Sequence, residues 1–318
     1  MKLLGNLDCE ARWAGAALPA AVQRRISLYA ALFAACAPDA AAGDHHEIWV
    51  PAPVDPARLL AHPGWTPPIV RTAGSAGGFD LAWADPAAAA ANDRSRGLAI
   101  AGERGVALPG ARVIASLAEL DAHVAGLGAR PWICKARWTA AGRDRARGTG
   151  AATGERRAQL ARMFARLGPL VFEPWLDRVA DLGVCGEITA AGEVELLEPH
   201  RQVTDPRGGF LGIELAPPVD RAIADELSAV ARAAAGRLAA QTGYRGRFAI
   251  DAFVYRPPGG GAPRLHPLCE LNARHSFGWI ARALAPRLGI RRLGFDAPPP
   301  GAIVLIAPAE DRVTAWCA

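Results

Sequence analysis

The chain has 318 residues, of which 51% are hydrophobic and 21% are charged, and its formal net charge is +5. A chain of this length and composition is globular and suits two or three packed lobes. The 36 basic residues exceed the 31 acidic ones only slightly and are dispersed, which excludes a nucleic acid as the main partner. Small anionic ligands fit this charge better.

An N-terminal α/β lobe is predicted for residues 1–110. An amphipathic helix follows Pro19, because apolar residues recur there at intervals of three and four. The proline-rich segment 51–68 is either a functional or covering loop or a plain surface excursion. The predicted strands of this lobe are residues 3–7, 47–50, 69–72 and 79–84.

A small α+β lobe is predicted for residues 111–176. Ser116, with Glu119 three residues later, is typical of a helix N-terminus. A strand that contains Lys135 follows, and a glycine-rich segment comes after it. The other elements expected in and just before this lobe are helices at 87–104, 116–127 and 154–167 and strands at 112–115 and 170–174.

A large lobe rich in antiparallel strands is predicted for residues 177–318. The segment 190–192 ends in glycine and reads as a three-residue hairpin loop. Residues 257–263, rich in proline and glycine, read as a second turn. The elements expected here are strands at 183–189, 193–198, 209–215 and 247–255, a strand that ends at Asn272, and helices at 218–242 and 276–288.

The six cysteines are widely spaced and include no Cys-x-x-Cys pair. This argues against a zinc site or a disulfide scaffold and favours free thiols in a reducing compartment. The apolar stretch 14–37 is interrupted by Gln23, Arg24 and Arg25, so neither a signal peptide nor a membrane span is supported. We therefore expect a cytoplasmic protein with no membrane partner, and a homodimer is compatible with these features.

Lys135 stands out in a chain that otherwise uses arginine. Only Lys2 and Lys135 among the 36 basic residues are lysine, and Lys135 lies in an apolar run that reads as a buried strand. An unpaired ammonium there would cost several kcal/mol, so an anion is expected beside it. The glycine-rich segment that follows makes a nucleotide phosphate the natural candidate.

A polar strand face is the strongest chemical signal. Residues two apart on a strand project to the same face, so Glu270 and Asn272 point together, and Asp251 and Arg247 share a face of the partner strand. Carboxylate and carbonyl oxygens suit Mg²⁺. A solvated sheet face with an arginine salt bridge is the alternative interpretation of the same pattern.

Taken together, these motifs resemble the ATP-grasp superfamily, which includes D-alanine ligases, biotin carboxylase and carbamoyl-phosphate synthases. The resemblance extends from about residue 92 to residue 278. It implies an α/β (α+β) architecture in which an N-terminal small α/β lobe precedes a two-lobed ATP-grasp fold with antiparallel sheets that clamp the nucleotide. The motifs that occur in the expected order are Lys135 with its glycine loop, the segment Glu173-Pro-Trp-Leu, Asp181, Asp251 and the pair Glu270-x-Asn272.

The resemblance implies an ATP site. Lys135 would contact the α- and β-phosphates, and the backbone N–H groups of loop 141–150, with Gly142 and Gly148, would close over them. Arg96 occupies the position where relatives often carry a further phosphate-binding lysine. The residues expected at the adenine and ribose are Glu173, Trp175, Leu176 and Asp181.

The resemblance also implies a metal and a reaction centre. Asp251, Glu270 and Asn272 would hold one or two Mg²⁺ ions, with Mn²⁺ as an alternative, against the phosphates. Arg247 and Arg274 would stabilise charge on the transferring phosphoryl group. Substrate residues are less visible. The candidates are His200, His275 and Arg201, the last as a carboxylate clamp or as a structural salt bridge.

The function implied by the resemblance is that of an ADP-forming ligase. It would activate a carboxylate as an acyl phosphate and join it to an amine, with an amino acid such as glutamate as one candidate substrate. Two alternatives stay open: a phosphotransferase on the same fold, and a nucleotide-binding regulatory protein without turnover. The sequence does not identify the carboxylate, the amine, the pathway or the oligomeric state.

Overall fold

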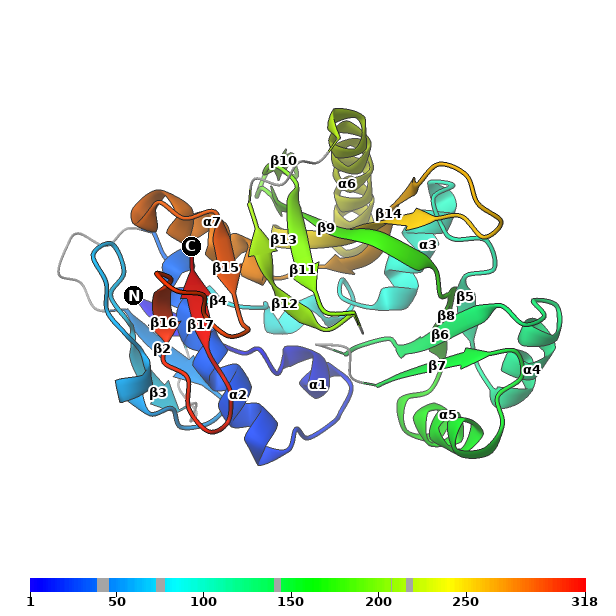
Figure 1. Cartoon of the computed structure of the whole chain (residues 1–318), viewed down its shortest axis with the longest axis horizontal. Coiled ribbons are helices and arrows are strands. Elements are labelled where there is room, and N and C mark those ends of the chain that lie inside the picture. The colour runs from blue at the N-terminus through cyan, green and yellow to red at the C-terminus, as the bar shows by residue number, and fades with distance from the viewer. Residues whose placement is uncertain (39–45, 73–77, 140–143, 207, 216–219) are drawn as a thin grey trace.

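The computed structural model describes residues 1–38, 46–72, 78–139, 144–206, 208–215 and 220–318, and these residues form three β-sheets (Figure 1). One sheet is parallel and lies in the N-terminal part of the chain. The other two are built from antiparallel pairs. This mixture of a parallel α/β lobe and antiparallel sheets confirms the predicted fold class.

The parallel sheet has the strand order β3-β2-β1-β4. The chain leaves β1 toward β2 on one side and reaches β4 on the other, so the strand order reverses beside the carboxyl end of β1. Ligands of open α/β sheets bind at such a point. The elements of this lobe are β1 (Lys2–Leu4), α1 (Cys9–Trp13), α2 (Ala20–Ala31), η1 (Leu32–Cys36), β2 (Glu47–Val50), η2 (Pro56–Arg58), β3 (Ile69–Thr72), β4 (Leu81–Ala82) and η3 (Pro86–Ala89).

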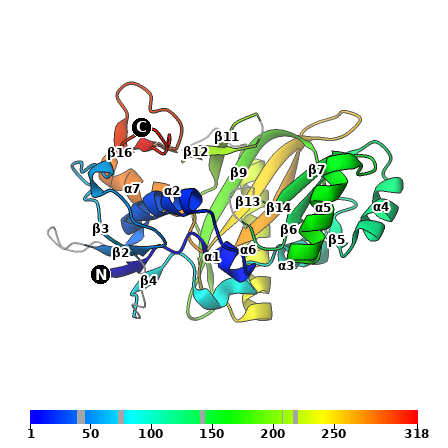
Figure 2. The same ribbon diagram turned by 90° about the horizontal axis from the view of Figure 1, so that it is seen from below.

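The small-lobe sheet has the strand order β5-β8-β6-β7. Its core contains Trp132, Phe172 and Leu160, which are fully buried. This sheet and its two helices occupy one end of the molecule (Figure 2). The elements are β5 (Arg112–Ile114), α4 (Leu117–Ala125), β6 (Pro131–Ala136), β7 (Arg145–Thr149), α5 (Gly154–Leu167) and β8 (Leu170–Pro174).

The largest sheet is centred on three long strands, β9 (Asp177–Ile188), β13 (Gly246–Arg256) and β14 (Arg264–Asn272). One face of these strands packs against α6 (Arg221–Thr242) through alternate apolar residues such as Val184 and Ile250 (Figure 1). The opposite face carries the polar residues. The other elements are α3 (Arg94–Glu103), β10 (Val194–Leu196), β11 (His200–Thr204), β12 (Phe210–Glu214), α7 (Phe277–Leu288), β15 (Arg292–Gly294), β16 (Ile303–Ile306) and β17 (Ala315–Cys317).

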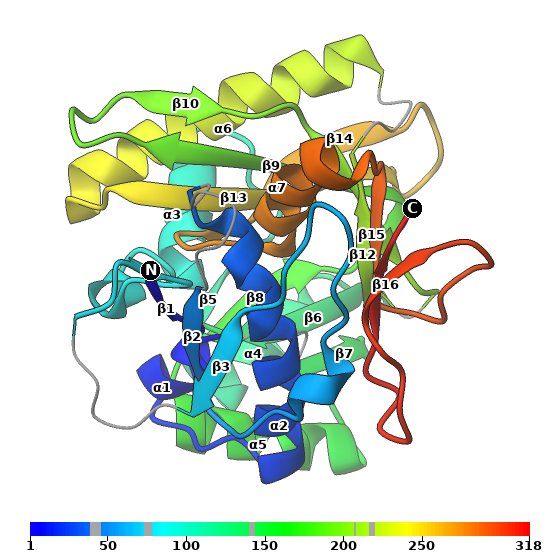
Figure 3. The ribbon, with the colours of Figure 1, turned by 90° about the vertical axis from the view of Figure 1, so that its left-hand side faces the viewer.

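The C-terminal segment joins the N-terminal lobe to the large sheet. Strands β15, β17 and β16 extend the large sheet, but their apolar side chains share a core with the N-terminal lobe, including Leu305 and Phe33. Leu59 forms a β-bridge with Ile306, and Figure 3 shows the connection between β2 and β3, which contains Leu59, running between the N-terminal strands and β16. The proposed lobe boundaries at residues 110 and 176 stay a prediction.

The predicted helix at residues 87–104 is wrong in its first half. A short 3-10 turn, Pro86–Ala89, comes first, and α3 begins only at Arg94. The reason is the side chain of Asp93, which accepts a hydrogen bond from the backbone N–H of Ser95 at 2.9 Å and so caps α3. An N-cap residue has an extended backbone conformation, so a continuous helix cannot pass through Asp93.

No helix in the described part of the chain has both the length and the hydrophobicity that a bilayer crossing requires.

Candidate active site

The register of the large sheet brings the predicted metal residues together. Asp251 pairs directly with Glu270 on β14, and Ala249 pairs with Asn272. Directly opposed residues of antiparallel strands share a face, so Asp251, Glu270 and Asn272 lie on the face away from α6. The predicted pairing of the two strands is confirmed.

Asp251 sits at the centre of a small hydrogen-bond network. Its Oδ1 accepts a hydrogen bond from Gln202 Nε2, and its Oδ2 accepts one from Asn272 Nδ2 at 3.3 Å. No three His, Cys, Asp or Glu side chains in the described ranges cluster as a metal site. The set therefore has two acids and depends on the Asn272 amide oxygen for a third donor, a composition that suits Mg²⁺.

The two acids differ electrostatically. Burial and the facing carboxylate of Glu270 raise the pKa of Asp251 to about 7. Burial also acts to raise the pKa of Glu270, but Arg94 and Lys135 outweigh it, so the pKa of Glu270 is lowered. Arg94 forms an ion pair with Glu270 at 2.7 Å, and a divalent cation held between the two acids would favour the ionised form of both.

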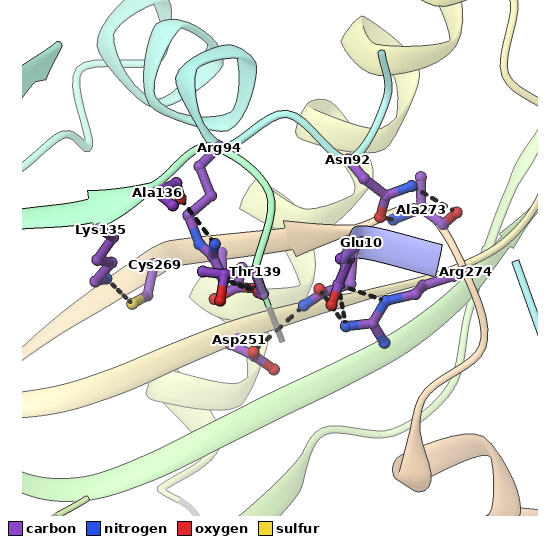
Figure 4. Close-up of polar contacts among 12 residues, drawn as sticks. Glu10, Asn92, Arg94, Lys135, Ala136, Thr139, Asp251, Cys269, Ala273 and Arg274 are labelled. Atoms are coloured by element: carbon purple, nitrogen blue, oxygen red, sulfur yellow. Dashed lines mark hydrogen bonds and ion pairs between the residues drawn. The ribbon is translucent and has the colours of Figure 1, made fainter. Parts of the chain in front are cut away.

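Lys135 has its expected anion within the protein. Its Nζ lies 2.5 Å from Glu173 Oε2 and 3.9 Å from Cys269 Sγ, and its side chain is 12% exposed. Burial alone would lower the pKa of Lys135, but Cys269 and Glu173 more than offset this and the pKa is raised. Lys135 is thus a fixed cation that reaches from β6 to β14, as Figure 4 shows.

Arg94 is a site residue that the sequence interpretation missed. Its Nη2 donates to Glu270 Oε1 at 2.7 Å and to the Thr139 carbonyl at 2.8 Å, and its Nη1 donates to the Ala136 carbonyl at 3.0 Å (Figure 4). It therefore joins β14 to the end of β6.

The predicted phosphate ligand Arg96 lies elsewhere. It bonds the Ala90 carbonyl at 2.9 Å and Gln241 Oε1 at 3.4 Å, where α3 contacts α6. Residue 96 is two positions beyond Arg94 in α3, and a helix turns by about 200° over two residues, so the side chain points away from Glu270.

The segment predicted to hold adenine and ribose runs from the end of β8, through the short connection that follows, into the first half of β9. Glu173 is buried and pairs with Lys135, whereas Trp175 stacks on the Arg147 guanidinium, 3.6 Å from its ring centre. Asp181 accepts hydrogen bonds from Arg178 at 2.8 Å and Thr204 at 2.9 Å. Leu176 lies in the same connection and is partly buried.

Arg178 adds a planar cation to this segment. Its guanidinium lies 4.1 Å from the ring centre of Phe253 and 5.4 Å from that of Trp175.

The two predicted loop glycines have different outcomes. Gly142 lies outside the described residues. Gly148 lies within strand β7 and pairs with Trp132, so at this position the expected loop is a strand. A Cβ on Gly148 would lie 2.2 Å from the Trp132 ring. The glycine is thus explained by packing against the indole.

Arg274 and Arg247 occupy different places. Arg274 donates to Glu10 and to Asn272 beside the acids. Arg247 is four residues before Asp251 on the same strand face, which places it about 14 Å from Asp251 along β13. Its ion-pair partner is Glu187, at 3.6 Å. It lies over the Trp279 ring at 4.4 Å, and its Nη1 is 3.1 Å from His275 Nε2.

His275 is buried and acts as a hydrogen-bond acceptor. Because arginine only donates, Nε2 accepts from Arg247, and Nδ1–H is left to donate to the Trp83 carbonyl at 3.3 Å. Burial and the Arg247 charge lower the pKa of His275 to about 3. The ring therefore holds Arg247 in place as a neutral group.

The other two predicted substrate residues lie on opposite faces of the large sheet. His200 and Asp251 both pair with Gly183, so His200 is on the face of the acids, whereas Arg201 is not. His200 is 2% exposed, and its ring fills the space beside Gly183 and Gly278, where added Cβ atoms would lie 2.6 and 2.7 Å from it. Arg201 is exposed and points to the other face of the sheet, with Nη1 3.7 Å from Glu214 Oε2. These contacts correspond to the structural alternative for Arg201.

Solved structures with the same arrangement of sheets decide the fold. The N5-carboxyaminoimidazole ribonucleotide synthetase of Thermus thermophilus aligns with TM-score 0.56 and 15% identity over 99% of this chain and 92% of that chain. The phosphoribosylamine–glycine ligase of Thermotoga maritima aligns with TM-score 0.57 and 12% identity over 100% and 89% of the two chains. The chain has the ATP-grasp fold.

A third ATP-grasp structure is a nucleotide complex. The N5-carboxyaminoimidazole synthetase of Staphylococcus aureus complexed with ADP aligns with TM-score 0.51 and 11% identity, over 86% of this chain and 70% of that chain. Neither a family model nor a curated protein matches the amino-acid sequence.

A cavity beside Arg94, Glu173 and Glu270 has a volume of about 20 Å³. This holds about one water molecule.

The buried histidines predict an acid-sensitive fold. Burial and the Arg282 charge lower the pKa of His200 to about 3, and His275 behaves alike. The unfolded chain then binds more protons, so stability is full above pH 6.5 and is lost as the pH falls toward 3. At pH 5 we expect each histidine to lower the free energy of unfolding by about 2 kcal/mol relative to pH 7.5. Urea denaturation at both pH values measures this, and a His200→Asn variant should show a smaller pH dependence.

Proposed function

We propose that this chain is an ATP-dependent ligase that activates a carboxylate as an acyl phosphate and joins it to an amine, releasing ADP and phosphate. One observation carries the proposal: Lys135 and Arg94 lie where the small lobe meets the strand that bears Glu270, and Asp251 faces Glu270. Fixed cations beside paired acids are what a bound triphosphate and its metal require. The similar structures, one of a synthetase and one of a ligase, support it.

In the proposed site, the protein cations hold the phosphates. Lys135 would exchange its ion pair with Glu173 for a contact with phosphate oxygens. Arg94 would likewise turn N–H groups of its guanidinium from Glu270 toward the phosphates. Arg94 Nε is buried and has no partner in the described structure, so one donor is already unused. The ADP complex of the Staphylococcus aureus enzyme supports a nucleotide in this fold.

Asp251, Glu270 and Asn272 would hold Mg²⁺ in this proposal. Their donor chemistry fits the ion, because two facing carboxylates and an amide oxygen are donors that Mg²⁺ prefers. When bound, Mg²⁺ neutralises charge on the phosphate oxygens. Gln202 and Arg274 would keep the Asp251 and Asn272 side chains oriented.

The carboxylate and the amine would meet near the carboxyl ends of β1 and β4. Asn6 joins these two ends, because its amide bonds the Ala84 carbonyl at 2.8 Å and the Ala84 N–H at 3.1 Å. The adjacent Trp83 carbonyl accepts a hydrogen bond from the backbone N–H of His275 at 2.9 Å, in addition to the one from the His275 ring. The reversal of strand order in the N-terminal sheet thus faces the segment that follows Asn272, as expected for a ligand site.

The chemistry needs no protein nucleophile. A carboxylate oxygen attacks the γ-phosphorus and ADP leaves, and the amine nitrogen then attacks the acyl carbon and phosphate leaves. Both steps build charge on oxygen, which fixed cations stabilise without reorganisation. The proposal also assigns three lobes to the chain, residues 1–110, 111–176 and 177–318, with the reactants held where the lobes meet.

A substrate screen tests the proposed function. ADP release is measured over pairs of carboxylates, including amino acids, and amines, and products are identified by mass spectrometry. We expect ADP release that requires both partners and yields a condensed product. ADP release with a phosphorylated product and no need for an amine would indicate a phosphotransferase instead. Binding of ATP without ADP release in any pair would indicate a regulatory protein.

The two arginines of α3 give a matched prediction. Arg94→Ala is expected to weaken ATP binding about 10-fold, because it removes charged hydrogen-bond donors beside the phosphates. Arg96→Ala is expected to leave the affinity unchanged, since its contacts lie between α3 and α6. Isothermal titration with ATP and Mg²⁺ compares them. An equal loss in both variants would contradict the assignment of Arg94.

A further inference from the structure

Glu10 connects the N-terminal lobe to the proposed reaction centre. It lies on α1, a few residues beyond the carboxyl end of β1, and it is 264 residues away in sequence from its partner Arg274. Its Oε1 accepts Arg274 Nη2–H at 2.7 Å and Nε–H at 2.9 Å. The Glu10 side chain is 5% exposed and that of Arg274 is 14% exposed, so the pair is shielded from water (Figure 4).

Arg274 passes this contact on to the metal residues. Its Nη2 also donates to Asn272 Oδ1 at 3.0 Å, and its Nη1 donates to the His275 carbonyl at 3.0 Å. Asn272 in turn donates to Asp251 at 3.3 Å. A chain of hydrogen bonds therefore runs from Glu10 through Arg274 and Asn272 to Asp251.

Arg274 has other carboxylates within electrostatic reach. Its hydrogen bond to Asn272, and that of Asn272 to Asp251, place its charge beside the strand pair that carries Asp251 and Glu270. Without Glu10, the guanidinium would be left with an uncompensated charge in a shielded place. The acids of the adjoining strand pair, Asp251 and Glu270, are the proposed metal ligands.

We infer that Glu10 is a positioning residue: it holds Arg274 against Asn272 and keeps the guanidinium off Asp251 and Glu270, so that the N-terminal lobe controls the geometry of the metal site. The inference rests on the proposed function for its kinetic consequence. Its structural consequence concerns the affinity for the metal and does not require turnover. Outer residues that orient a metal ligand commonly change metal affinity by about 10- to 100-fold when they are replaced.

A Glu10→Gln variant tests the inference, because glutamine keeps the size of the side chain and removes the charge. We expect the Mn²⁺ affinity in the presence of ADP, measured by electron paramagnetic resonance, to fall about 10-fold. The Kd for ATP without divalent ion should change less than about 3-fold, while kcat for ADP formation falls about 10- to 100-fold. Glu103→Gln is the matched control, since Glu103 also binds an arginine, Arg237 at 2.7 Å, but on the surface between α3 and α6. It should leave all three quantities unchanged.

A double-variant cycle shows whether Glu10 acts through Arg274. If it does, Glu10→Gln combined with Arg274→Gln lowers Mn²⁺ affinity no further than Arg274→Gln alone. The double variant also removes both charges, so it serves if Glu10→Gln alone does not fold. Additive losses, or an unchanged Mn²⁺ affinity in Glu10→Gln, would overturn the inference. Failure of the proposed function looks different: the parent then forms no ADP with any substrate pair, and the Mn²⁺ comparison still decides the role of Glu10.

Discussion

Replacing Lys135 by alanine is expected to weaken ATP binding by about 100-fold, because a charged hydrogen-bond donor to phosphate contributes about 1.5–3 kcal/mol. The ammonium is held beside Glu173 at 2.5 Å and close to Cys269, and no neighbouring lysine could replace it. Isothermal titration with ATP, with and without Mg²⁺, measures the change. The loss should appear in both conditions, since Lys135 does not belong to the proposed metal set.

The variant needs a control for the acid it leaves behind. In Lys135→Ala the buried Glu173 loses its partner, which by itself destabilises the protein. The double variant Lys135→Ala with Glu173→Gln removes that cost and should still bind ATP weakly. Lys2→Ala is a matched control, because Lys2 is the only other lysine and lies at the start of β1 beside the Trp49 ring. Unchanged ATP affinity in a folded Lys135→Ala protein would contradict the whole assignment.

The shared strand face of Asp251, Glu270 and Asn272, which are proposed to hold the metal, was predictable because it depends on one strand pairing. Period-two alternation fixes which residues share a face, and the turn between β13 and β14 leaves little choice of partner. The two strands pair as predicted and these residues share a face, and the observed register adds that Asp251 lies directly opposite Glu270. The same local reasoning correctly located the hairpin loop 190–192, which ends at Gly192 with a φ of +89°.

Other site residues depend on contacts between distant segments, which spacing does not encode. Arg94 and Arg96 differ by two positions, so only the start of α3, set by Asp93, determines which one faces Glu270. Glu10 pairs with a residue 264 positions away, and its short helix carries no motif. Gly148 follows from the bulk of Trp132 on the neighbouring strand. Such features are set by packing between distant parts of the chain, so they appear only with the fold.

An Asp251→Asn variant is expected to lose ADP formation by about 1,000-fold and to be more stable than the parent when no divalent ion is bound. The two effects have one cause. Asp251 is a partly buried carboxyl that faces Glu270, and its pKa is raised to about 7 by burial and by that neighbour. The native state therefore favours the protonated form, and the stability gained from this is lost as the pH rises from about 4 through 7.

Above pH 7 the ionised Asp251 destabilises the ligand-free fold, and asparagine removes that charge at nearly constant size. We expect the free energy of unfolding at pH 8 with a chelator to rise by about 1–2 kcal/mol in Asp251→Asn. Adding Mg²⁺ and ATP should stabilise the parent and not the variant, because ligands that bind only the native state raise its stability. The control is Asp225→Asn, whose carboxylate pairs with Arg221 on the exposed side of α6 and should affect neither activity nor stability strongly. A variant that lost stability with chelator present, or kept full ADP formation, would mean that Asp251 is a structural acid and that the charge needed beside Glu270 is supplied by Arg94 alone.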